Sequence, residues 1–162
     1  MVETMAITME MPEGANIIIG QTHFIKTAED IYEILINAAP GIKFGIAFCE
    51  ASGPRLIRIE GNDDHLKDTS ARNAKNIAAG HTFVILMKDA YPINVLNALK
   101  LCPEVCTVFC ATANPLQVIV AKTAQGNGII GVVDGYSPAG TETGKDILDR
   151  RQLLRKIGYK LP

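Results

Sequence analysis

Short runs of apolar and β-branched residues, bounded by Gly, Pro or Asn, constrain the fold of this 162-residue chain most strongly. Runs of this length are typical of β-strands. We expect strands at 5–10, 15–19, 43–49, 55–60, 82–88, 105–111, 116–122 and 128–133. Segments with helical spacing and helix-starting residues lie between and after them, and we expect helices at 27–38, 64–78, 92–101 and 144–157.

The turn residues predict how some of these strands pair. Segment 43–60 predicts a hairpin turned at Ala51-Ser52-Gly53-Pro54, and segment 105–133 predicts a three-stranded meander. The alternation of strands and helices predicts an α/β fold with a mixed sheet and helices packed on its faces. A chain of this length, without a linker or an internal repeat, is expected to form a single domain over residues 1–162.

Composition excludes several classes of function. The net charge is −1 and charged residues make up 20% of the chain, so no basic excess favours nucleic acid as the main partner. No apolar run approaches the roughly 18 to 20 residues that span a bilayer, and the N-terminus lacks a signal-peptide core. We therefore expect a cytoplasmic protein without nucleic-acid or membrane partners.

Cysteines recur at every fourth position in LCPEVCTVFC, as Cys102, Cys106 and Cys110. Zinc ligands usually form close pairs at tight turns, with a second pair elsewhere. Segment 105–110 instead resembles a buried strand in which Cys106, Val108 and Cys110 share one face. We expect these cysteines to pack as small apolar residues rather than to bind a metal.

Most of the unusual polar residues follow the predicted strands. Loops at strand ends often form the crevice in which an α/β protein binds its ligand. Glu50, Asp63, Asp89 and Asp134 lie in such loops, where a carboxylate can act as a base or bind Mg²⁺. Taken alone, each of these residues is explained as a turn former or a solvated charge. Their shared location in loops after strands is what favours a ligand-binding site.

Two glycine-containing segments resemble phosphate-binding motifs. GNGIIGVV (126–133) has the spacing of a nucleotide loop, but a strand rather than a helix is predicted to follow its glycines. GTETGKD (140–146) lacks the glycine spacing of a P-loop. Both segments are better explained as turns, so any phosphoryl chemistry must use another scaffold.

Six long stretches resemble one known family, and they cover the chain from about residue 14 to residue 160. They are GQTHFIKTAEDIYE, GIKFGIAFCEASG, AAGHTFVILMKDAYPINVLNALK, PEVCTVFCATANP, GIIGVVDGYSPAGTET and LLRKIGYK. They are similar to the archaeal and bacterial adenosine-specific kinases. The resemblance implies a three-layer αβα sandwich, a homotrimer, binding of adenosine and AMP, and a stably phosphorylated histidine.

The resemblance does not say which histidine is modified, but physical reasoning ranks the candidates. His65 lies among aspartates, where a phosphate would meet like charge. His81 opens a predicted strand and can be a buried, hydrogen-bonded residue. His23 lies beside Lys26 just before a predicted helix, where free N–H groups and the lysine favour a phosphoryl group. We therefore rank His23 first and His81 second.

The implied mechanism is transfer of a phosphoryl group from the histidine to the 5′-hydroxyl of adenosine. Asp89 or Asp134 would accept the hydroxyl proton, while Lys26 and possible Mg²⁺ would offset charge, with ATP as a possible donor. Glu50 and Asp63 are further candidates for substrate binding. Residues expected to contact adenine are Asn94, Asn114, Tyr91 and Phe48.

Two alternatives remain open on the sequence alone. The first is an adenosine- or AMP-binding sensor whose phosphohistidine is stable and turns over little. The second is a structural trimer with incidental ligand affinity, which leaves the polar loop residues unexplained.

Overall fold

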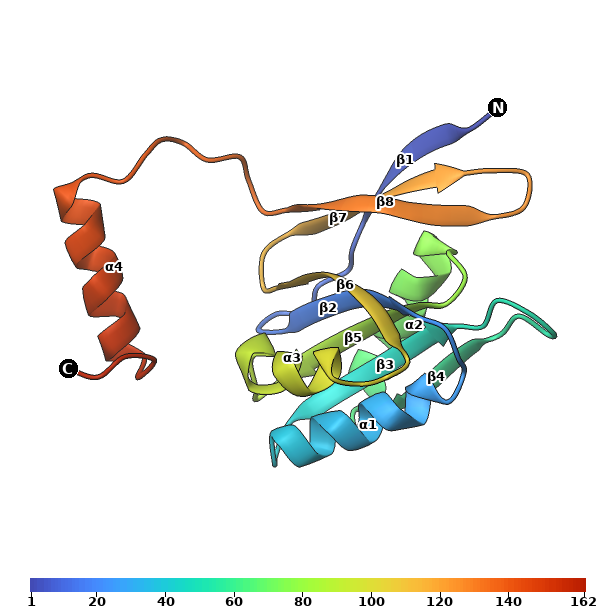
Figure 1. Ribbon diagram of the computed structural model, residues 1–162, viewed down its shortest axis with the longest axis horizontal. Helices are drawn as coiled ribbons and strands as arrows, with labels where there is room; N and C mark the ends of the chain where they lie inside the picture. The colour runs from blue at the N-terminus through green and yellow to red at the C-terminus, as the bar shows by residue number, and fades with distance from the viewer.

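Strands and helices alternate along the chain in the computed structural model, which describes residues 1–162 (Figure 1). The strands are β1 (Glu3–Thr8), β2 (Asn16–Thr22), β3 (Lys43–Cys49), β4 (Ile57–Gly61), β5 (Thr82–Lys88), β6 (Val105–Thr112), β7 (Leu116–Lys122) and β8 (Asn127–Asp134). The helices are α1 (Thr27–Ala38), α2 (Asp64–Ile77), α3 (Pro92–Lys100) and α4 (Gly144–Lys156). The predicted α/β class is confirmed.

The strands divide between two sheets. The large sheet has the order β4-β3-β5-β2-β6 and the small sheet the order β1-β7-β8. Every pairing of these strands is antiparallel, so the prediction of one mixed sheet is wrong. The 43–60 hairpin is confirmed as β3–β4, but the meander is only half formed. The turn at Asn114-Pro115 carries the chain from one sheet to the other, and a turn signal does not specify which strands pair across it.

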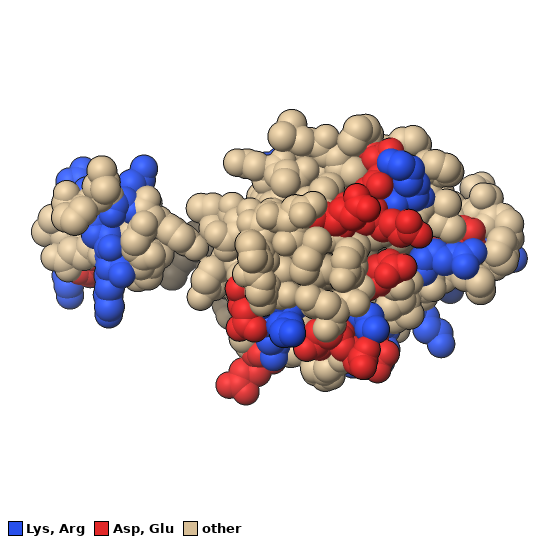
Figure 2. Space-filling view, turned by 90° about the horizontal axis from the view of Figure 1, so that it is seen from below, with Lys and Arg blue, Asp and Glu red and all other residues tan.

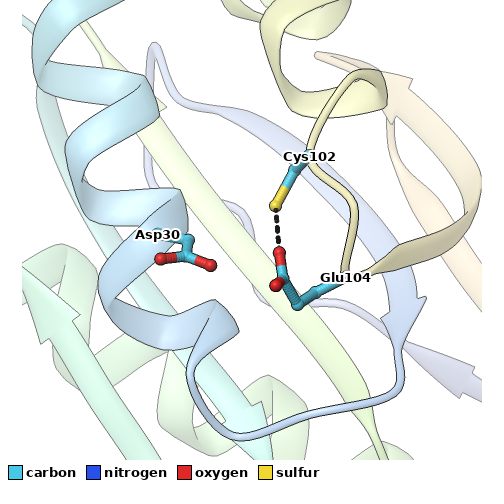
Figure 3. Close-up of side chains that lie close together, drawn as sticks. All are labelled: Asp30, Cys102 and Glu104. Carbon is cyan, nitrogen blue, oxygen red and sulfur yellow. Dashed lines mark hydrogen bonds between the residues drawn. The ribbon is translucent and has the colours of Figure 1, made fainter.

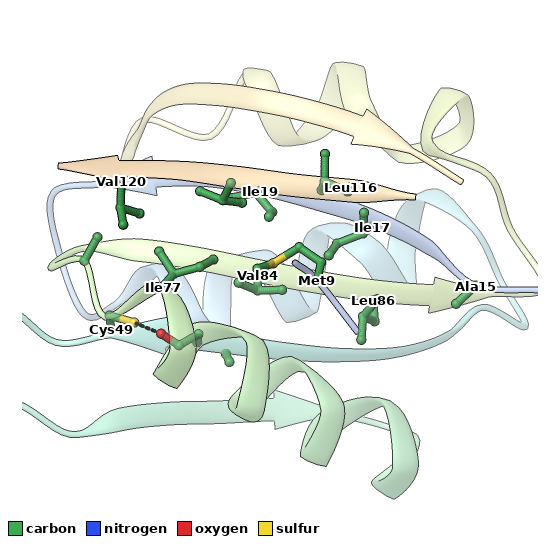
Figure 4. Packing of buried hydrophobic residues seen from close by; sticks show 14 of the residues in the cluster. Met9, Ala15, Ile17, Ile19, Cys49, Ile77, Val84, Leu86, Leu116 and Val120 are labelled. Carbon is green, nitrogen blue, oxygen red and sulfur yellow. Dashed lines mark hydrogen bonds between the residues drawn. The ribbon is translucent and has the colours of Figure 1, made fainter. Parts of the chain in front are cut away.

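Alternation along the central strands builds a core on each face of the large sheet. Ile17 and Ile19 on β2 point into one buried cluster, whereas Ile18 between them points into the other. Helices α1 and α3 cover the second face. Helix α2 and the small sheet cover the first, as Figure 4 shows for the buried side chains between them. The molecule is therefore layered, with the large sheet in the middle.

Helix α2 lies unusually close to β3. A Cβ atom at Gly45 would lie 2.2 Å from the backbone nitrogen of Lys67, so only glycine allows this approach. Ser70 adds a hydrogen bond from its hydroxyl to the Gly45 carbonyl, at 3.0 Å. These contacts fix the axis of α2 and therefore the position of its C-terminal end.

The cysteines on β6 do not share one face as predicted. Cys110 and Val108 pair with the consecutive residues Ile19 and Gly20 of β2, so β6 has one extra residue at this point. This β-bulge changes which residues of β6 face each side of the sheet. Cys110 consequently packs against one cluster and Val108 against the other, while Cys106 is exposed at the sheet edge.

The last segment, residues 136–162, stands away from the rest of the chain in Figure 1. We call it the C-terminal arm and residues 1–135 the body. The arm contains α4, in which no residue is buried. None of the helices has the length and apolar character needed to cross a lipid bilayer.

Candidate functional site

Both favoured histidines lie at one end of the large sheet. The backbone N–H of His81 donates to Cys49 at the end of β3 (2.7 Å), and the N–H of Thr22 donates to the His81 carbonyl (2.9 Å). The next residue, His23, donates its N–H to Glu104 just before β6 (3.1 Å). We call this edge the histidine end. It brings together four of the predicted site residues: His23, Lys26, Glu50 and His81.

The remaining predicted site residues lie at the opposite end of the large sheet. They are Asp63, Asp89, Tyr91, Asn94, Asn114 and Asp134, which adjoin the start of β3, the end of β5 or the end of β6. Strands of about seven residues separate the two ends by roughly 20 Å. Asp89 and Asp134 therefore lie too far from His23 and His81 of the same chain to accept the hydroxyl proton in a transfer from either histidine, so that expectation is wrong for a site within one chain.

Several residues at the opposite end have structural partners. Asp63 caps α2, because its Oδ1 accepts from the N–H of Leu66 at 2.9 Å. Asn94 Oδ1 accepts from the N–H of Tyr91 at the start of α3. Asp134 accepts from the Thr112 hydroxyl (2.7 Å) and from the Asn114 amide (3.1 Å), which joins β6 to β8. These bonds give the residues a role in holding turns and helix ends.

A cavity of about 770 Å³ opens at the histidine end. Its walls come from the β3–β4 loop, the C-terminal end of α2 and the tip of the β7–β8 hairpin. The lining residues are Cys49, Glu50, Ala51, Arg55, Leu56, Ile57, Ala74, Lys75, Ala78, Ala79, Gly80, Thr123, Gln125, Gly126, Asn127 and Gly128. A cavity of this volume, lined by both apolar and polar side chains, fits a nucleoside-sized ligand.

The charged groups of the cavity are unequally engaged. Glu50 accepts hydrogen bonds from the N–H of Leu56 (3.0 Å) and from the Arg58 guanidinium (3.1 Å), and these bonds lower the pKa of its carboxyl. Arg55 and Lys75 take part in none of the ion pairs. The cavity therefore contains an ionised acceptor and two cations without a counter-charge.

His81 follows the lining residues Ala79 and Gly80 directly. Its backbone is left-handed, with φ at 60°, a conformation that is uncommon for a residue other than glycine and that recurs at functional sites. The imidazole is half-buried and stacks on Phe48, with ring centroids 5.7 Å apart. Phe48 itself is buried in the core beneath this ring, so its predicted stacking on adenine is wrong.

His23 lacks the surroundings that the sequence predicted for it. The first N–H groups of α1 already donate to the carbonyls of Phe24, Ile25 and Lys26, so they are not free for a phosphate. The Lys26 ammonium is 2.6 Å from Asp30 Oδ2 and 3.0 Å from Glu104 Oε1, and both carboxylates raise its pKa. The lysine is thus already neutralised by two acids.

The same acids form a small cluster with Cys102, which Figure 3 shows between α1 and the segment before β6. The Cys102 thiol donates to Glu104 Oε2 at 3.2 Å. Hydrogen bonding from Lys26, and then from Cys102, lowers the pKa of Glu104 to about 2. The ammonium group supplies the positive charge that a cation would bring to this cluster, so the arrangement is explained as an ion-pair network.

Sequence reasoning missed Arg55 and Lys75. Arg55 lies one residue beyond the predicted turn at Ala51-Ser52-Gly53-Pro54. The sequence could therefore have predicted that it lies in the same cavity as Glu50. Lys75 lies on the predicted helix 64–78 and carries no local signal, because only the packing of α2 brings its last turn to the histidine end.

Comparison with known proteins agrees with this architecture. Over residues 7–160 the chain matches the family described as "Adenosine specific kinase". It is 52% identical to the PH1918 protein from Pyrococcus horikoshii OT3, whose crystal structure superimposes with a TM-score of 0.96 over 100% of both chains. No curated protein matches it. The chain belongs to the adenosine-specific kinase family.

Proposed function

We propose that the protein binds adenosine in the cavity at the histidine end and transfers a phosphoryl group to its 5′-hydroxyl, which produces AMP. Membership of the family supports the substrate and the reaction class. The observation that carries the proposal is the cavity itself, which combines apolar side chains with Arg55 and Lys75, two cations without an ion pair. Such cations stabilise the charge that develops on a transferring phosphoryl group.

The cavity offers a group for each part of the nucleoside. Leu56, Ile57 and the alanines provide an apolar surface for adenine, and the Gln125 amide provides a donor and an acceptor for its edge. The lowered pKa of Glu50 keeps its carboxylate ionised and makes it a weak base. It is therefore better suited to accept hydrogen bonds from the ribose hydroxyls than to remove a proton from them. These residues replace Tyr91, Asn94 and Asn114, which lie at the opposite end.

We assign the phosphoryl carrier to His81 rather than His23. His81 adjoins the cavity lining, whereas His23 lies beside a lysine that Asp30 and Glu104 neutralise. In the transfer, the P–N bond to the imidazole breaks and a P–O bond to the 5′-hydroxyl forms. The imidazole keeps the electron pair of the P–N bond, and the hydroxyl proton passes to it.

The cavity lining does not provide a protein site for Mg²⁺. Glu50 is its one carboxylate, and Arg58 already binds both oxygens of that group. Mg²⁺ commonly binds through one or two carboxylates together with substrate phosphates. We therefore propose that any Mg²⁺ arrives with a nucleoside triphosphate donor such as ATP. The family resemblance further supports a cytoplasmic homotrimer.

The assignment of His81 predicts different outcomes for two matched variants. Phosphorylated protein should lose one phosphoryl mass when adenosine is added, and AMP should appear in equal amount. His81→Asn should carry no acid-labile phosphoryl group, because the attacking nitrogen is absent. His23→Asn removes the same chemical group at the same sheet end and should be phosphorylated like the wild type. Intact-protein mass spectrometry and AMP chromatography measure both.

Two results would contradict the proposal in different ways. Loss of the phosphoryl group in His23→Asn, with its retention in His81→Asn, would reverse the histidine assignment. Stable phosphoprotein that binds adenosine without forming AMP would support the alternative, a sensor of adenosine or AMP. Circular dichroism of both variants excludes unfolding as the cause.

A further inference from the structure

The C-terminal arm is a helix without a packing partner in its own chain. It leaves the body after β8, and no residue of α4 is buried (Figure 1). Its start is held only locally, by Asp146 Oδ2, which accepts from the N–H of Thr143 at 2.7 Å. Isolated helices of this length are marginal in water, and most helical stability in proteins comes from packing of an apolar face. Helix α4 therefore needs a surface to pack on.

The arm has an apolar face and a charge opposite to that of the body. Ile147, Leu154 and Ile157 project from one side of the helix, with Arg150 among them. Ile147 and Leu154 are half-buried, and Ile157 is 49% exposed. The arm carries six basic and three acidic residues, a net charge of +3, whereas the body carries ten basic and fourteen acidic residues, a net charge of −4. Figure 2 shows Lys and Arg side chains along α4 and groups of Asp and Glu side chains on the body.

The body has one uncovered sheet face, on the outside of the small sheet. Val118 and Val120 point inward into the core, so the alternate residues point outward. The outward residues are Thr4, Ala6, Thr8, Gln117, Ile119, Ala121, Ile130, Gly131 and Val133. None of these residues is charged, and Ile130 is 61% exposed. This uncharged outer face could pack against the apolar side chains of α4 without burying a charge of the sheet.

The position of the arm is shared with a crystal structure. The PH1918 protein superimposes over 100% of both chains with a TM-score of 0.96. A differently placed arm would lower that score, so the arm extends from the body in both proteins. A helix that keeps an extended position without contacts in its own chain is held by something outside that chain.

We propose that the arm of one copy packs the Ile147, Leu154 and Ile157 side of α4 on the uncharged outer face of the small sheet of a second copy. Opposite net charges of arm and body favour this exchange. In its own chain, β8 leads straight into the arm, which extends away from the small sheet. Exchange around a closed ring gives every copy one arm donated and one received. The proposal does not rest on the phosphotransfer activity.

Disulfide trapping between two different chains tests the contact. Both chains carry Cys106→Ser, which removes the exposed native thiol. One chain also carries Leu154→Cys, and the other carries Ile130→Cys and a tag that changes its mass. After co-expression and mild oxidation, we expect a mixed disulfide band that reduction removes. Gln152→Cys lies on the opposite side of α4. Paired with Ile130→Cys, it should give at least about tenfold less of the mixed disulfide than Leu154→Cys gives.

Particle size in light scattering provides a second test, which does not depend on disulfide formation. Ile147→Ser/Leu154→Ser/Ile157→Ser should give smaller particles than the wild type in light scattering, while Asp149→Ser/Gln152→Ser should not. Adenosine binding and circular dichroism show whether the body remains folded. The proposal is overturned if the wild type is monomeric, or if the disulfide forms only within a chain that carries both Leu154→Cys and Ile130→Cys.

Discussion

At the scale of single residues, hydrogen bonding distinguishes two histidines that look alike in the sequence. Both flank predicted strands, and both lie at the same sheet end. The expectation for His23 relied on free N–H groups at the start of α1, but the preceding turn uses them. His81 has the unusual backbone and the neighbouring cavity. The sequence identifies the residue types and the loop. Whether the backbone N–H groups are free or already hydrogen-bonded depends on the conformation of the loop.

Lys75 is the residue at which a charge effect is most directly testable. Lys75→Met removes an unpaired cation from the cavity and keeps the length of the side chain. Because a hydrogen bond to a charged group contributes about 1.5–3 kcal/mol, we expect the Kd of AMP to rise about ten- to a hundredfold. The Kd of adenosine, which has no phosphate, should change far less. Isothermal titration calorimetry measures both.

Lys67→Met is the matched control for this experiment. Lys67 lies on the same helix, but it pairs with Asp64 at 2.7 Å, at the other end of α2. Its replacement should leave the affinity for AMP unchanged. An equal loss of AMP and adenosine affinity in Lys75→Met would argue that the lysine shapes the cavity rather than binding phosphate.

At the scale of elements, Glu104 links α1 to the start of β6 through Lys26. The carboxyl has a pKa of about 2 in the folded chain, below its ordinary value of 4.5. A lowered folded-state pKa stabilises the fold above the ordinary pKa, and this contribution is lost as pH falls from there towards 2. Glu104→Gln should therefore melt below the wild type at pH 7, and the gap in Tm should close between about pH 4.5 and 2.

Glu29 provides the comparison for this pH profile. It lies in the first turn of α1, the helix that Glu104 contacts through Lys26, and it makes no ion pair. Glu29→Gln should follow the wild type across the whole pH range. A gap between wild type and Glu104→Gln that stays constant down to pH 2 would show that the variant acts through packing and not through ionisation.

Local patterns predicted most elements closely and their partners poorly. Helix 27–38 and strands 43–49, 82–88 and 116–122 have the predicted bounds, because apolar period and turn residues are local properties. The pairing of Ile17 with Thr112 joins residues far apart in sequence, and no short motif encodes it. The bulge opposite Gly20 was missed for the same reason. Glu50 and His81 were placed at the candidate site, while Lys75 required the tertiary path of α2.

At the scale of the whole molecule, exchange of arms would make thermal stability depend on protein concentration. Binding between copies stabilises the folded state by mass action, so Tm should rise as the concentration increases. Ile147→Ser/Leu154→Ser/Ile157→Ser should melt at a Tm that does not change with concentration. Calorimetry over an approximately hundredfold range of concentration measures the difference.

Asp149→Ser/Gln152→Ser changes the polar side of α4 and should retain the concentration dependence of the wild type. A wild-type Tm that is independent of concentration would contradict arm exchange. A triple variant that keeps the full dependence would instead show that copies associate through another surface.

The pairing of β1 with β7 also determines the order in which the protein can be completed during translation. Glu3 lies opposite Lys122 and Thr8 opposite Gln117, so β1 leaves the ribosome long before the strand that it pairs with. Until residue 122 has emerged, Met5 and Ile7 have no sheet to join, while the β3–β4 hairpin can already form. The small sheet therefore closes only after β7 has emerged, and a nascent chain stalled before β7 leaves Met5 and Ile7 of β1 without a partner strand.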